Sequence, residues 1–154
     1  MIVLFFRGCA ESTEPVRQVH SSFSELSGLT VFDNNGKSQQ LFAESLDVRV
    51  VVSPGGQWIV VEDMQLSNLV VIRAFKYTEG SYQKIALPEI RQHWEALSRK
   101  AGIVFEDLVH PRVGIEEFGP LENTVLLHFQ ADTGLKEHPE IDSVVEIGLD
   151  KDIE

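Results

Sequence analysis

Residues 47–87 contain four short segments that are rich in β-branched and aromatic residues, with only short turns between them. The segments read DVRVVVS, QWIVVED, LVVIRAFKY and SYQKIAL. The turn formers PGG (54–56) separate the first pair, and TEG (78–80) separates the last pair. Such composition between turn formers is typical of β-strands. Because a parallel crossover needs about a dozen residues or more, these strands must run mostly antiparallel.

A first helix is expected over about residues 14–27. Pro15 suits the first turn of a helix, and Gly28 stands where helices commonly end. The apolar residues between them recur at spacings of three and four, which is the period of one helical face. These residues are Val16, Val19, Phe23 and Leu26.

A second helix is expected over about residues 88–102. Pro88 fits the first helical position. Arg99 and Lys100 lie at the carboxyl end, where the helix dipole favours cations, and Gly102 follows them. One face of the segment is apolar and consists of Ile90, Trp94, Leu97 and Ala101.

Further strands are expected on either side of these elements. Asn35-Gly36 is a strong hairpin signal and predicts strands over about 29–33 and 38–43. Residues 124–131 (TVLLHFQA) predict another strand, in which His128 would be a hydrogen-bonded core or sheet residue. Residues 139–149 fit either a short helix or a last strand, and we favour the helix.

Together these elements predict an α+β fold in a single globular domain over residues 1–154. It would contain a mostly antiparallel sheet of about five to seven strands, with the helices 14–27 and 88–102 packed on one face. Residues 104–122 show no sustained period and are expected to be an irregular segment. The end of the chain, 150–154, is expected to be frayed.

Negative charge is concentrated in the last third of the chain. Residues 1–102 carry 10 Lys and Arg against 11 Asp and Glu, a net charge of −1. Residues 103–154 carry 3 against 13, a net charge of −10. An acidic surface repels phosphate and attracts a basic protein. The competing interpretation is a solvated surface with no dedicated partner.

The irregular acidic segment is the expected site of partner binding. A loop of nearly twenty residues is uncommon in a compact domain and is often functional. Carboxylates around a few apolar anchors suit an interface with a basic protein. The residues assigned to this interface are Glu106, Asp107, Arg112, Glu116, Glu117, Phe118 and Glu122.

A small enzyme is the alternative. Cys9 lies between an apolar run and a predicted helix, where the helix dipole favours the reactive thiolate. A structural thiol that packs like a small apolar residue is the competing interpretation of Cys9. Glu106, Asp107 and His110 would meet on one helical turn as an acid–base pair or a divalent-metal site. No zinc-type spacing or His-Glu-x-x-His motif accompanies them, so neither catalysis nor a metal site is favoured.

We therefore expect a non-catalytic acidic domain that captures a basic protein, such as a bacterial immunity protein or an inhibitor of a toxin or nuclease. No cofactor and no direct binding of nucleic acid is expected. No apolar stretch approaches the roughly 20 residues of a membrane helix. The single cysteine fits a reducing compartment, so we expect a cytoplasmic protein. The sequence leaves the oligomeric state open.

Overall fold

The computed structural model describes residues 2–3, 18–21, 28–32, 37–66, 69–87 and 89–149. These residues form eleven strands in three sheets, in which every pair of neighbouring strands is antiparallel. They also form one α-helix, α1 (Glu89–Ala101), and one short 3-10 helix, η1 (Phe105–Asp107). No helix within these ranges is long and apolar enough to cross a membrane.

Each sheet is built from strands that follow one another in the chain. The first sheet has the order β1-β2-β3-β4. The second has the order β5-β6-β7-β8, and the third has the order β11-β10-β9. The bounds of the strands are β1 Ile2–Val3, β2 Gln18–Ser21, β3 Leu29–Phe32, β4 Ser38–Phe42, β5 Asp47–Val52, β6 Trp58–Leu66, β7 Leu69–Thr78, β8 Ser81–Ile85, β9 Val109–Phe118, β10 Thr124–Asp132 and β11 Glu140–Gly148.

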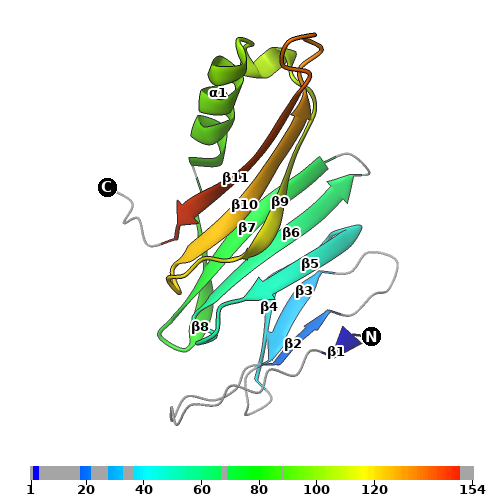
Figure 1. Cartoon of the computed structure of the whole chain (residues 1–154). Helices are drawn as coiled ribbons and strands as arrows, with labels where there is room; N and C mark the ends of the chain where they lie inside the picture. The colour runs from blue at the N-terminus through cyan, green and yellow to red at the C-terminus, as the bar shows by residue number, and fades with distance from the viewer. Residues whose placement is uncertain are drawn as a thin grey trace.

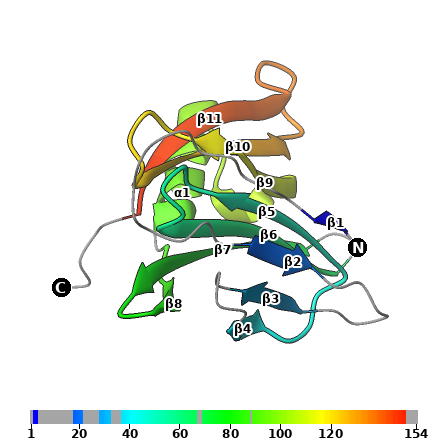
Figure 2. The same ribbon diagram turned by 90° about the horizontal axis from the view of Figure 1, so that it is seen from below.

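The second sheet lies between the other two, as the view in Figure 2 shows. Strand β6 explains this position, because four successive residues, 58–61, are buried. Successive side chains of a strand point to opposite faces. Trp58 and Val60 enter the core shared with the third sheet, whereas Ile59 and Val61 enter the core shared with the first sheet. A strand that is buried on both faces shows a continuous apolar run instead of alternation.

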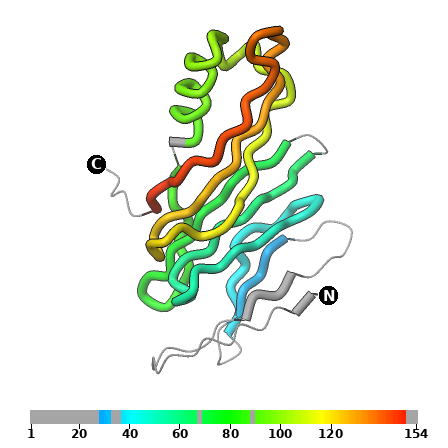
Figure 3. The backbone as a smooth tube through the Cα atoms, in the orientation of Figure 1, coloured from blue at the N-terminus to red at the C-terminus, as the bar shows by residue number. Residues whose placement is uncertain are grey.

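Helix α1 lies beside the third sheet, along the half where β10 and β11 meet their connecting loop (Figure 1, Figure 3). Trp94 is its anchor: the indole makes an edge-on contact with the ring of Phe129 at 5.0 Å. Phe105 of η1 lies 6.1 Å from the same indole and helps to cover it. Such aromatic contacts add about 0.5–1.5 kcal/mol to the burial of the rings.

The free edge of β9 is held by two side chains of the middle sheet. The Glu62 carboxylate accepts the backbone N–H of Ile115, and the Arg49 guanidinium donates to the carbonyl oxygens of Ile115 and Glu116. Arg49 and Glu62 also form an ion pair, with 3.1 Å between Nη1 and Oε1. Edge strands carry unpaired backbone groups, which these side chains satisfy. The pair therefore fixes the third sheet to the middle one.

Several predicted elements are confirmed. The expected hairpin over 29–43 corresponds to β3 and β4, and the four strands within 47–87 correspond to β5–β8. The helix expected over 88–102 is α1, and the strand expected over 124–131 is β10.

The predicted α+β class, with two main helices on one sheet, is wrong. The described residues are mostly β-structure in three sheets and contain a single α-helix. Within the predicted helix 14–27, residues Gln18–Ser21 form strand β2, in which Val19 is opposite Val31 of β3. The backbone groups of these residues therefore pair with a neighbouring strand instead of with a helical turn. The rest of 14–27 lies outside the described residues, as do Cys9 and the tail 150–154.

Two expectations about the last third are also wrong. Residues 139–149 are not a helix, because β11 pairs with β10 over its whole length. Residues 104–122 are not irregular either, since they contain η1 and the ten-residue strand β9. Strand β9 was missed because its sequence, VHPRVGIEEF, contains a proline and a glycine and shows no sustained alternation. The side chains that hold its outer edge, Arg49 and Glu62, come from a distant part of the sequence.

Candidate functional site

The outward face of the third sheet gathers six of the thirteen carboxylates of the last third. Residues that are paired across antiparallel strands point to the same face. The pairing places Arg112, Gln130 and Asp142 in one row, and Leu126 and Glu146 in another. We call this surface the acidic face; its carboxylates are Glu116, Glu117, Asp132, Glu140, Asp142 and Glu146. The acidic face also carries one arginine and two histidines, which are Arg112, His110 and His128.

His128 lies at the centre of the acidic face, on the middle strand of the sheet. Its Nδ1 is 2.7 Å from Oε1 of Glu116 on β9, and its Nε2 is 2.6 Å from Oδ1 of Asp142 on β11. The imidazole therefore links all three strands through side chains. The side chain of His128 is 25% exposed, whereas those of Glu116 and Asp142 are 48% and 58% exposed.

These contacts raise the pKa of His128 above its ordinary value. The hydrogen bond with Asp142 is the largest cause, and the one with Glu116 acts in the same direction. Partial burial of the ring opposes them by disfavouring the charged form. The result is an imidazole that holds its proton more strongly than an exposed histidine does.

An apolar side chain lies among these charges. Val144 is opposite His128 in the register of β10 and β11, and it is 54% exposed. Leu126, one step along the face, is partly buried. Exposed apolar groups inside a polar rim are the arrangement of many protein interfaces.

A polar hollow of about 300 Å³ opens at the end of the acidic face. It is lined by His110 and Arg112 of β9 and by Asp132, Glu140 and Asp142 of β10 and β11. His110 has a left-handed backbone, with φ of +51°, next to a shift in the register of β9 and β10. Its Nδ1 lies 3.9 Å from Oδ2 of Asp132, which is too long for a direct hydrogen bond.

The structure brings together only part of the predicted partner-binding set. Arg112, Glu116 and Glu117 lie on the acidic face. Phe118 is partly buried and packs against the core. Glu122, in the turn between β9 and β10, accepts a hydrogen bond from Ser53 at 3.1 Å.

The other two members of the set, Glu106 and Asp107, lie in η1, away from this face. Glu106 forms an ion pair with Arg91 of α1 at 3.0 Å. The proposed helical turn of Glu106, Asp107 and His110 does not form, since His110 belongs to β9. Over the described ranges, no three His, Cys, Asp or Glu side chains are grouped as a metal site.

Two features of the acidic face were missed in the sequence: the double contact of His128 and the contribution of β11. The signal for β11 was present, because Ile141, Val145 and Ile147 have the spacing of one strand face. Read as a strand, the segment places Glu140, Asp142 and Glu146 together on the other face. The contact of His128 depends on register, which the sequence does not show.

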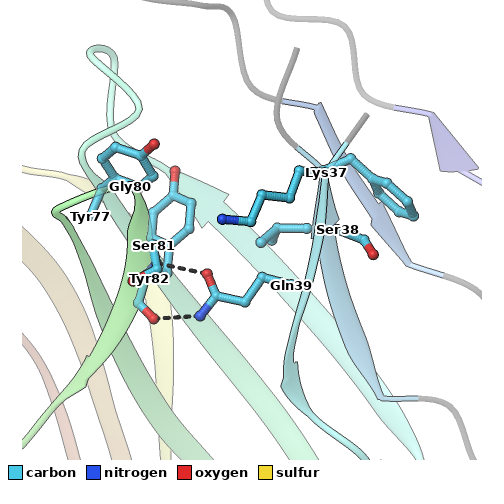
Figure 4. Close-up of a pocket in the computed structure, with 9 residues that line it drawn as sticks. Lys37, Ser38, Gln39, Tyr77, Gly80, Ser81 and Tyr82 are labelled. Carbon is cyan, nitrogen blue, oxygen red and sulfur yellow. Dashed lines mark hydrogen bonds between the residues drawn. The ribbon is translucent and has the colours of Figure 1, made fainter. Parts of the chain in front are cut away.

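A second hollow, of about 230 Å³, lies between the first and middle sheets (Figure 4). Its walls are mainly apolar and aromatic, with Val31 on one side and Tyr82 on the other. The Gln39 side chain crosses between the sheets: its Nε2 donates to the carbonyl oxygen of Tyr82, and its Oε1 accepts the Tyr82 N–H, both at 2.7 Å. The amide thus pairs with the edge of β8 as another strand would. The hollow is small for a ligand site, since such sites span about 300–1,000 Å³.

No protein-family model, no curated protein and no solved structure matches this chain.

Proposed function

We propose that this chain is a non-catalytic binding domain that captures a basic protein through the acidic face. The observation that carries the proposal is the gathering of six carboxylates on one solvent-exposed sheet surface around the exposed Val144. Among the residues assigned to the acidic face, Arg112 is the one whose side chain is permanently cationic. A surface of this charge speeds the encounter with a basic partner and disfavours nucleic acid.

The β-sheet context supports binding more than catalysis. The carboxylates lie on regular strands whose positions are fixed by pairing, and the face carries an apolar group that a partner can cover. Interfaces commonly combine such an apolar centre with a polar rim. A toxin or nuclease is an attractive partner class, because carboxylates can occupy a site that is built for phosphates. The encounter is proposed to take place in the cytoplasm, on the basis of the single cysteine.

The test compares two charge reversals of equal size. Glu116→Lys/Glu117→Lys changes the acidic face, whereas Glu106→Lys/Asp107→Lys changes η1 by the same net charge. Each tagged protein is used to capture partners from the native source, and the affinity for a captured basic protein is measured over a series of salt concentrations.

We expect the affinity of the parent protein to fall steeply with salt, as it does when charges meet across an interface. The Glu116/Glu117 variant should bind at least about tenfold more weakly, which corresponds to about 1.4 kcal/mol. The Glu106/Asp107 variant should lose much less. Equal losses in the two variants, or binding that does not change with salt, would contradict the proposal.

A further inference from the structure

His128 has a carboxylate oxygen at hydrogen-bond distance from each of its two ring nitrogens. A neutral imidazole carries one N–H donor and one lone pair, and both nitrogens donate only in the imidazolium. A neutral His128 would therefore point a lone pair at one of the two carboxylates. The observed geometry, with 2.7 Å to Glu116 and 2.6 Å to Asp142, is satisfied by the protonated ring.

The charged groups that face the ring from the neighbouring elements are mostly carboxylates, so they do not remove the need for a proton on His128. On β9, Arg112 is the neighbouring cation, and Glu117 is a further carboxylate. On β10, Asp132 is the other ionisable group, and on β11 these are Glu140 and Glu146. From the middle sheet, Arg49 contacts the carbonyl of Glu116 but is paired with Glu62. His110 shares the hollow with Arg112 and Asp142.

We infer that His128 is a proton-operated switch for the acidic face: the protonated ring neutralises part of it, and loss of the proton prepares it for a basic partner. The inference rests on the proposed function. With the imidazolium present, His128, Glu116 and Asp142 carry one net negative charge; after deprotonation they carry two. One carboxylate also loses its hydrogen-bond donor and becomes available to a partner.

Thermodynamic linkage fixes how pH changes the affinity for the partner and how partner binding changes the titration of His128. A basic partner favours the deprotonated state, so its affinity increases as the pH rises through the titration of His128. By the same coupling, partner binding lowers the pH at which His128 titrates and releases a proton to solvent. One additional charge at contact distance contributes about 1 kcal/mol in a water-exposed site, or roughly fivefold in affinity.

The first experiment follows the imidazole protons of the isolated protein by NMR between about pH 5 and pH 9, the range that includes histidine titration. We expect the midpoint of His128 to lie above the ordinary histidine value of about 6.5 and to fall in Asp142→Asn. A midpoint at or below about 6.5 would overturn the inference.

The second experiment uses hexalysine as the probe, since its ammonium groups stay charged over this range. Binding is measured by calorimetry at about pH 5.5 and pH 8.5, and the bound surface is mapped by amide shifts. We expect the affinity to be about fivefold higher at the upper pH. This gain should disappear in His128→Gln and persist in the matched variant His138→Gln. Amide spectra confirm that each variant is folded.

The outcomes separate the two proposals. If hexalysine binds the acidic face but the pH dependence is absent, or survives in His128→Gln, the switch is refuted and the binding function stands. If the dependence disappears equally in His138→Gln, the titrating group has been assigned wrongly and the inference fails. If hexalysine causes no shifts on β9–β11 at either pH, the binding function is contradicted and the switch with it.

Discussion

Asp63 of β6 and Arg73 of β7 form an ion pair on the face of the middle sheet that is turned toward the first sheet, with 2.5 Å between Arg73 Nη2 and Asp63 Oδ2. The Asp63 side chain has no exposure to solvent. Its Oδ2 accepts hydrogen bonds from Arg73 and Gln65, whereas Oδ1 has no hydrogen-bond partner among the described residues. The guanidinium also lies over the ring of Phe42 at 5.0 Å. The carboxylate therefore depends almost entirely on one cation.

Arg73→Met should strongly destabilise the fold. The substitution leaves the buried carboxylate without its cation, and breaking such a pair costs about 3–5 kcal/mol. Urea unfolding followed by circular dichroism measures the free energy. The double variant Asp63→Asn/Arg73→Met, which removes both charges, should be more stable than the single variant. If the two variants unfold at the same urea concentration, the ion pair does not have this role.

Glu62→Leu should loosen the attachment of β9 to the middle sheet. The substitution removes the acceptor of the Ile115 N–H, and an unsatisfied buried backbone group costs about 1–3 kcal/mol. Hydrogen exchange at the Ile115 amide should accelerate more than exchange at the Leu127 amide of β10. Glu62→Gln retains an acceptor oxygen and is the matched control, with most of the protection preserved. Unchanged exchange in Glu62→Leu would rule out the anchoring contact.

Gln39→Ala should weaken the contact between the first sheet and β8. It removes two hydrogen bonds to the Tyr82 backbone, each of which contributes about 0.5–1.5 kcal/mol. We expect a loss of about 1–3 kcal/mol in the free energy of unfolding. Gln40→Ala is the control, since Gln40 is the exposed neighbour on the same strand. Equal stability of the two variants would contradict the bridging role of Gln39.

The stability contributed by His128 should be present at low pH and disappear at high pH. Its pKa in the folded state is raised above the value in the unfolded chain. A raised pKa stabilises the fold fully below the unfolded value, about 6.5, and the contribution is lost as the pH rises through the folded value. The difference in unfolding free energy between the parent protein and His128→Gln should therefore shrink from about pH 5.5 to pH 9. A difference that grows with pH would give the opposite sign and exclude this linkage.

The sequence predicted those elements whose signals are local. The hairpins β5–β6 and β7–β8 are closed by glycine-containing turns, and α1 has its own boundary residues and an apolar face. These signals act over a few residues, so they are visible without knowledge of the fold. The acidity of the last third was equally visible, because it depends only on composition.

The sequence did not predict the elements whose structure is decided by pairing with another strand. Val19 fits a helical stripe, but it also suits a strand, and its position opposite Val31 shows which pairing prevails. In β11 the apolar residues fit both periods, and β10 provides the partner that selects a strand. The contact of His128 with Glu116 and Asp142 joins three strands, so it requires a register that no single segment contains.

Because β6 is buried on both faces, it tolerates polar substitutions less well than a strand that has one solvent-exposed face. A sheet with a solvent face accepts polar residues at every second position. From Trp58 to Val61 no such position exists, because each successive side chain enters one core or the other. A polar substitution anywhere in this stretch damages one of the two sheet–sheet interfaces, so in a mutational scan it should appear as four consecutive intolerant positions.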